Sequence, residues 1–301
     1  MQHAIPTRIQ LNHDTQYVYD HPVTLSPHLI RLRPAPHAPN FIQRYDLNIE
    51  PAGHELRWQQ DPFANFQARV VFPNKTERLR IEVSMLLELQ PINPFDFFLD
   101  DTATKFPFTY DADMQRNLAL YLMAPEKTQL LFNYAARPAV QQLLGGGTVD
   151  FVVGLAAQVA KDIAYETRME EGVQEARLTL QKRRGSCRDS AWLLIQLFRH
   201  FGLAARFVSG YLIQLATGEN LGPAAGGVGK DTVDLHAWCE VYLPGAGWVG
   251  LDATSGLLAG AGHLPLAAAP SPVGAAPVTG LAELAQVEFS FSHSIRRVND
   301  E

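Results

Sequence analysis

The stretch RGSCRDSAWLLIQLFRHFG, residues 184–202, decides how the second half of the chain folds. Apolar residues recur in it with the 3.6-residue period of a helix, and Gly202 is a typical stop after the last turn. Ser186 predicts the N-cap, and Asp189, three residues on, predicts its capping-box partner. Cys187 is therefore expected in the first turn, where free backbone N–H groups and the positive end of the helix dipole stabilise a thiolate.

A lone cysteine is more often a small buried hydrophobe than a reactive group. The glycine and serine ahead of Cys187, and the charged Arg188 and Asp189 behind it, are an unusual setting for a core residue. Because Cys187 lies four residues before the apolar Ala191, it shares the helix face that turns towards the protein body. Arg188 and Asp189 are expected to cap the helix and form ion pairs rather than to take part in chemistry.

Two strand-like segments downstream carry a histidine and an aspartate. In the first of them, alternation puts His236 and Trp238 on one face and Cys239 on the other. A neutral imidazole at His236 could take the thiol proton, and Asp252 at the end of the next strand could fix the tautomer and orientation of the ring. Each has a simpler alternative, a structural histidine and a turn aspartate. Together with Cys187 they are the parts of a cysteine nucleophile.

The first hundred residues predict β structure, because short runs of β-branched and aromatic residues alternate with Pro and Asn clusters. We expect an N-terminal β-sandwich domain over residues 1–110 and a connecting helical and loop region over 111–148. Residues 149–301 should form a second domain, an α+β core in which helices precede antiparallel strands. Two segments rich in Gly and Ala, 218–230 and 256–280, are expected as irregular surface loops that could rim a site.

Composition narrows the class of protein. The chain has 301 residues, a hydrophobic content of 47% and a net charge of −6, so it can fill two cores and lacks the basic stripe of a nucleic-acid-binding protein. It has no apolar run long enough to span a membrane, and its first residues do not form a secretory signal. With two cysteines and no His/Cys group at ligand spacing, neither a disulfide framework nor a metal site is expected. We therefore expect a cytoplasmic protein without cofactors and with neither a nucleic-acid nor a membrane partner.

At these residues the chain resembles the transglutaminase-like superfamily, within the papain-like cysteine peptidase fold. More narrowly, it resembles the bacterial transglutaminase-like proteins grouped with cysteine proteases, which carry an N-terminal β-sandwich region. The matching text is GSCRD (185–189), ARFVSGYL (205–212), HAWCEVY (236–242) and GWVGLDAT (247–254), with VTLSPH (23–28) and LRP (32–34) in the first half. The catalytic part of the resemblance covers about residues 150–265. Ala253 stands where the family commonly has proline, which should alter the local turn and not the chemistry.

The resemblance implies that Cys187 is the nucleophile, His236 the general base and acid, and Asp252 the orienting residue. The expected reaction is acyl transfer, in which the thiolate attacks an amide carbonyl and an oxyanion hole holds the tetrahedral intermediate. The backbone N–H of Cys187 is one natural oxyanion donor, and Gln174 and Trp238 are candidates for oxyanion or substrate contacts.

Hydrolysis of a peptide or amide bond through a thioester is the expected outcome, with a peptide or protein as substrate. Two alternatives stay open. In a transamidase, an amine instead of water would resolve the same thioester, and the sequence does not separate the two reactions. In a non-catalytic scaffold, the β-rich half would bind peptides. The sequence defines neither the individual substrate nor the oligomeric state.

Overall fold

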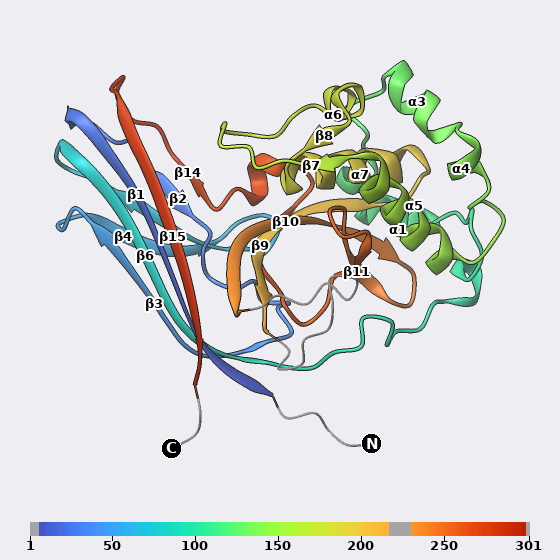
Figure 1. Cartoon of the computed structure of the whole chain (residues 1–301), viewed down its shortest axis with the longest axis horizontal. Helices are drawn as coiled ribbons and strands as arrows, with labels where there is room; N and C mark the ends of the chain where they lie inside the picture. Colours follow the sequence, from blue (N-terminus) through green and yellow to red (C-terminus); the bar gives the residue numbers. More distant parts are fainter. Residues whose placement is uncertain (1–5, 217–229, 299–301) are drawn as a thin grey trace.

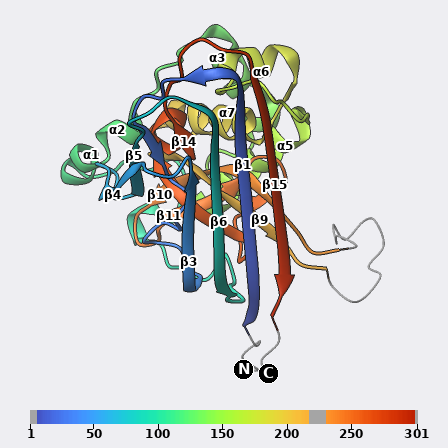
Figure 2. The same cartoon turned by 90° about the vertical axis from the view of Figure 1, so that its left-hand side faces the viewer.

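The computed structural model describes residues 6–216 and 230–298, in which a β-sandwich lies beside a part built of helices and a further sheet (Figure 1). The sandwich has one sheet of order β15-β1-β6-β3 and a second of order β14-β2-β5-β4. Figure 2 looks onto the first sheet, whose long strands run side by side. The sandwich strands are β1 (Thr7–Val23), β2 (His28–Ile30), β3 (Phe41–Glu50), β4 (Glu55–Gln60), β5 (Phe66–Val71), β6 (Thr76–Leu89), β14 (Val278–Thr279) and β15 (Val287–Arg297).

Strict alternation of apolar and polar residues explains the sandwich. In β6 every second residue from Leu79 to Leu89 is buried, and the residues between them are polar or more exposed. Successive side chains of a strand point to opposite faces, so this pattern buries one face and leaves the other to solvent. Apolar residues of both sheets form one core, as predicted for the N-terminal β-sandwich, and Tyr211, Ile213, Val233, Leu264 and Leu266 from the second part of the chain join it.

The second part contains a five-stranded antiparallel sheet of order β12-β11-β10-β9-β13, and its helices gather on the side away from the sandwich (Figure 1). The predicted α+β class is confirmed. The strands of this part are β9 (Ala205–Gln214), β10 (Thr232–Leu243), β11 (Gly247–Asp252), β12 (Leu257–Leu258) and β13 (His263–Ala269), with a short parallel pair β7 (Ala164–Tyr165) and β8 (Arg184–Gly185). The helices are η1 (Asp101–Ala103), α1 (Ala112–Asn117), α2 (Ala119–Leu122), α3 (Gln129–Ala135), α4 (Pro138–Gln141), α5 (Thr148–Asp162), α6 (Ala176–Lys182), α7 (Cys187–His200) and η3 (Pro272–Ala275).

Helix α7 is the centre of this part. The apolar positions that predict the helix are Ala191, Leu194, Ile195, Phe198 and Phe201; the first four are fully buried and Phe201 is half-buried. Helix α7 packs against β10. The helix ends where predicted, because Gly202 has a φ of +79°, a left-handed conformation that glycine adopts without strain. The nucleophile candidate thus begins a helix that is held on most of its surface.

Two expectations about the C-terminal third are wrong. Strand β15 was expected in the second domain, but it pairs with β1 along the edge of the first sandwich sheet, so the chain returns to its N-terminal part. Segment 256–280, expected as an irregular loop, contains β13, which pairs with β9 and is buried from Leu264 to Ala269. Its small alanines pack closely against the neighbouring strand, so this segment forms part of the core despite its low-complexity composition.

Segment 218–230 was expected as a surface loop, and all of it except Lys230 lies outside the described residues. Among the helices of the described part, none is long and apolar enough to cross a membrane.

Candidate active site

The structure places Cys187 as predicted, at the first residue of α7. Ser186 is the N-cap, and its backbone N–H donates to the Asp189 carboxylate at 2.9 Å, which completes the predicted capping box. The Cys187 side chain is half-buried and borders the core around α7. Because the first backbone N–H groups of a helix have no intrahelical acceptor, the N–H of Cys187 is available to an anion.

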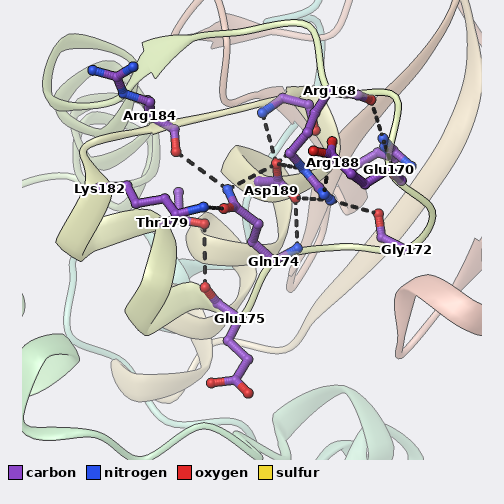
Figure 3. A network of polar contacts seen from close by, with 11 residues as sticks. Arg168, Glu170, Gly172, Gln174, Glu175, Thr179, Lys182, Arg184, Arg188 and Asp189 are labelled. Atoms are coloured by element: carbon purple, nitrogen blue, oxygen red, sulfur yellow. Dashed lines mark hydrogen bonds and ion pairs between the residues drawn. The ribbon is translucent and has the colours of Figure 1, made fainter.

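A network of polar contacts holds the start of α7 (Figure 3). Asp189 is fully buried and accepts hydrogen bonds from Gln174 N at 2.8 Å, Gln174 Nε2 at 3.2 Å and Arg168 Nε at 2.9 Å. The Ser186 hydroxyl donates to the same carboxylate at 2.9 Å. Burial alone would raise the pKa of Asp189, but the bonds from Arg168, Gln174 and Ser186 outweigh it and lower the pKa. The charge of Asp189 is therefore satisfied, and the helix start is tied to the segment that precedes α6.

Arg188 also serves this network. Its guanidinium donates to the carbonyl oxygens of Arg168 at 2.7 Å and Glu170 at 3.2 Å, which fixes the same segment from the other side (Figure 3). These contacts are in line with the structural roles expected for Arg188 and Asp189.

His236 lies on β10, and its ring forms a hydrogen bond with the Cys187 side chain at the start of α7. Its Nε2 is 3.1 Å from Asp252 Oδ2, which leaves Nδ1 for the hydrogen bond between the ring and the Cys187 thiol. Burial lowers the pKa of His236, but the bonds and charges of Asp252 and Cys187 outweigh it and raise the pKa to about 10. At neutral pH a ring with this pKa carries both protons and faces the Cys187 sulfur.

Asp252 is the last residue of β11, the strand next to β10. Thr254 holds its Oδ1 with the backbone N–H at 2.8 Å and with the hydroxyl at 2.7 Å. The carboxylate is buried, which would raise its pKa, but the bonds from His236, His263 and Thr254 hold the pKa far below its usual range. A buried carboxylate that stays ionised can stabilise an imidazolium at His236.

A second histidine contacts Asp252. His263, the first residue of β13, has Nε2 at 3.5 Å from Asp252 Oδ2, while its Nδ1 accepts a hydrogen bond from Gly260 N–H at 3.1 Å. The ring of His263 also lies edge-on to Trp238, with centroids 5.2 Å apart. His263 was not among the predicted site residues, because it lies in the segment interpreted as an irregular loop. The signal that could have shown it is the apolar run that follows it, LPLAAA (264–269), which is long enough for a buried strand.

His236, Asp252 and His263 could in principle hold a metal ion, since their ligand atoms lie within 4.8 Å of one another. Hydrogen bonding accounts for the cluster without an ion. Asp252 Oδ2 accepts from both rings, and an ion there would have to displace the Nε2 protons of both histidines. We interpret the cluster as hydrogen-bonded.

The structure brings Cys187, His236 and Asp252 together and places the other two candidates differently. The Gln174 side chain is used in the Asp189 network, and its Oε1 accepts from a lysine of α6. An oxyanion role for Gln174 stays a prediction, and these contacts favour a structural one. Trp238 is almost fully buried and stacks beside His236, with ring centroids 6.4 Å apart. It therefore supports the imidazole from the protein interior, and its position does not favour a substrate contact.

Both halves of the chain match known family models. Residues 9–88 match the family model of the bacterial transglutaminase-like N-terminal region, and residues 140–253 match that of the transglutaminase-like superfamily. The chain is 30% identical over 267 residues to uncharacterized protein Rv2569c of Mycobacterium tuberculosis, covering 82% of this chain and 79% of that protein. The same values hold for uncharacterized protein Mb2599c of Mycobacterium bovis.

Among solved structures, the crystal structure of a "Putative Cysteine Protease" from Cytophaga hutchinsonii is similar over nearly the whole chain. The match has a TM-score of 0.69 and 17% sequence identity, and it covers 99% of this chain and 93% of that one. At this identity the likeness shows the fold, which includes both the sandwich and the part that carries Cys187.

Proposed function

The chain belongs to the transglutaminase-like superfamily, and we propose that it is a cysteine-dependent acyl-transfer enzyme that hydrolyses a peptide or amide bond. One observation carries the proposal: the thiol of Cys187, at the start of a helix, is hydrogen-bonded to His236, whose other ring nitrogen is bonded to a buried Asp252. A nucleophile, a base and a residue that orients the base, in contact in that order, are the parts that covalent acyl transfer requires.

The proposed reaction begins with attack of the Cys187 thiolate on the substrate carbonyl, which forms a C–S bond and moves an electron pair onto the carbonyl oxygen. The imidazolium of His236 then gives its Nδ1 proton to the leaving amine as the C–N bond breaks, and a thioester remains on Cys187. His236, now neutral, takes a proton from water as its oxygen forms a C–O bond to the thioester carbon. The C–S bond then breaks, which releases the acid and returns Cys187 as the thiolate beside the imidazolium of His236. Asp252 keeps its charge throughout and stabilises the imidazolium of His236.

For the developing oxyanion, we propose the backbone N–H of Cys187 as one donor. It lies in the first turn of α7, where the helix dipole favours negative charge. The network around Asp189 supports this role, because it fixes the backbone just ahead of and behind Cys187. Loss of one such donor typically costs on the order of a hundredfold in rate.

A transamidase would use the same three residues, with a primary amine in place of water. The test is release of the leaving amine from a labelled peptide library, with and without a small primary amine present. We expect hydrolysis products that depend on Cys187 and persist when the amine is added. Amine incorporation that exceeds hydrolysis would replace the hydrolase proposal by the transamidase one.

Cys187→Ala and Cys239→Ala form a matched pair for this assay. Cys239 is a fully buried thiol on the core side of β10, and burial raises its pKa well above the usual range, so it is chemically quiet. Turnover should disappear in Cys187→Ala and persist in Cys239→Ala. Binding of peptides without any turnover in the wild-type protein would favour the non-catalytic scaffold.

A further inference from the structure

His263 lies at the start of β13 and contacts the same Asp252 oxygen as His236. Its side chain is 12% exposed, and the carboxylate that it contacts is 3% exposed. The two histidine rings have centroids 6.0 Å apart, so both bracket one carboxylate. Nothing in the reaction proposed above uses His263.

The bonds of His263 define where its proton is. Its Nδ1 accepts from the Gly260 backbone N–H at 3.1 Å, and a backbone N–H can only donate. Nδ1 therefore carries no proton, and in the neutral ring the proton sits on Nε2, which points at Asp252 Oδ2. His263 is thereby held as a donor to Asp252 and not as a second base.

The four side-chain hydrogen bonds described for the Asp252 carboxylate form two pairs, one pair on each oxygen. Thr254 provides both donors to Oδ1, and the two histidines provide both donors to Oδ2. Thr254 holds one oxygen, and His263 contacts the other, the oxygen that also contacts the His236 ring. Trp238 supports this arrangement, since its ring contacts both histidines.

We propose that His263 is a positioning residue of the active site, which donates its Nε2 proton to Asp252 and so holds the carboxylate on the His236 ring. The role rests on the proposed function for its catalytic meaning, but the geometry can be tested without turnover. Without this donor, water would reach Asp252 Oδ2 and weaken its interaction with His236. Such relaxation lowers the pKa of His236 from about 10 towards its ordinary value of 6.5, because the bonds and charges of Asp252 and Cys187 together outweigh the lowering effect of burial.

Two substitutions separate the two bonds of His263. In His263→Gln, the amide nitrogen can take the place of Nε2 and donate to Asp252, but the bond from Gly260 is lost. In His263→Asn, the shorter side chain can accept from Gly260 but no longer reaches Asp252. His21→Asn is the control, because His21 is an exposed histidine of the sandwich that pairs with Asp20.

The measurement is an NMR titration of the His236 ring in protein labelled at histidine. We expect a downward shift of the His236 titration by about one pH unit or more in His263→Asn, and a smaller shift in His263→Gln. His21→Asn should match the wild type. Where a substrate is available, His263→Asn should lower kcat with little change in KM, because the proposed role of His263 acts through Asp252 and not through a substrate contact.

Three results would overturn the proposal: an unshifted His236 titration in His263→Asn, equal shifts in both variants, or a larger shift in His263→Gln. If His263→Asn does not fold, the ring-nitrogen chemical shifts of His263 in the wild-type protein decide the question, because they distinguish the two neutral tautomers. An Nε2–H tautomer of His263 supports the proposal, and an Nδ1–H tautomer contradicts it. If the His236 titration shifts as expected in the two variants but the protein has no hydrolase activity, the proposed function is rejected and the positioning role stands.

Discussion

Replacing Asp252 by asparagine tests how far the protein depends on a charged partner for His236. In the wild type, Thr254 donates twice to one carboxylate oxygen, and His236 and His263 donate to the other. An asparagine has one oxygen, and its two bonds from Thr254 would turn the NH2 group towards both histidines. His236 would then have to accept at Nε2, which puts its proton on the nitrogen that faces Cys187 and removes it as a base.

The magnitude follows from the pKa of His236. A rise from 6.5 to about 10 corresponds to roughly 5 kcal/mol at 1.36 kcal/mol per unit, and it is shared by Asp252 and Cys187 against the opposing effect of burial. The bond to Asp252 is the largest of the influences that raise the pKa, so its loss should lower the pKa of His236 by about one unit or more. Asp252→Asn should therefore weaken the proposed thiolate–imidazolium pair by about 10-fold or more at pH 6 to 7.

The assay is alkylation of Cys187 by iodoacetamide between pH 5 and 9, followed by mass spectrometry of the peptide that contains it. Asp234→Asn is the matched control, because Asp234 lies two residues from His236 on the same strand but is 76% exposed. We expect slow alkylation at low pH in Asp252→Asn and a wild-type curve in Asp234→Asn. Superimposable curves for the wild type and Asp252→Asn would refute the reasoning.

Other predictions concern the start of α7 and the second thiol. Asp189→Asn should lower the free energy of unfolding by about 3–5 kcal/mol, since it leaves donors facing a buried amide. Because the pKa of Asp189 is lowered in the folded protein, this difference should be full above the ordinary value of 3.8 and shrink as the pH falls below it, as measured by urea unfolding. Gly185→Ala should cost about 1–3 kcal/mol, because its Cβ would lie 2.8 Å from Asp189 Cβ, whereas Gly146→Ala has room and should change little in thermal unfolding. Cys239 should be alkylated only after unfolding, while Cys187 reacts in the folded protein; equal labelling of both under native conditions would count against their assigned environments.

The sequence was sufficient for features that depend on neighbours along the chain. The start of α7 at Cys187, its capping box and its stop at Gly202 rest on local residue preferences, and all three are found. The contact between His236 and Asp252 could also be anticipated, because two adjacent antiparallel strands joined by a tight turn fix which residues lie near each other.

Features that depend on distant pairing could not be predicted. Strand β15 pairs with β1 at the other end of the chain, and alternation within a strand does not say which sheet it joins. His263 was missed for a related reason, because the Gly, Ala and Pro around it resemble a loop until β9 is seen to pack against them. The bonds of Gln174 to Asp189 likewise join segments that no local pattern connects.

The central claim is that Cys187 and His236 form a thiolate–imidazolium pair. Ultraviolet absorbance near 240 nm reports thiolates directly, and the difference between the wild type and Cys187→Ala isolates this one. We predict that the difference is already present at pH 6, where an ordinary thiol with a pKa of about 8.5 is almost fully protonated, and that it disappears at this pH in His236→Ala. A difference that develops only around pH 8 to 9, with or without His236, would contradict the account.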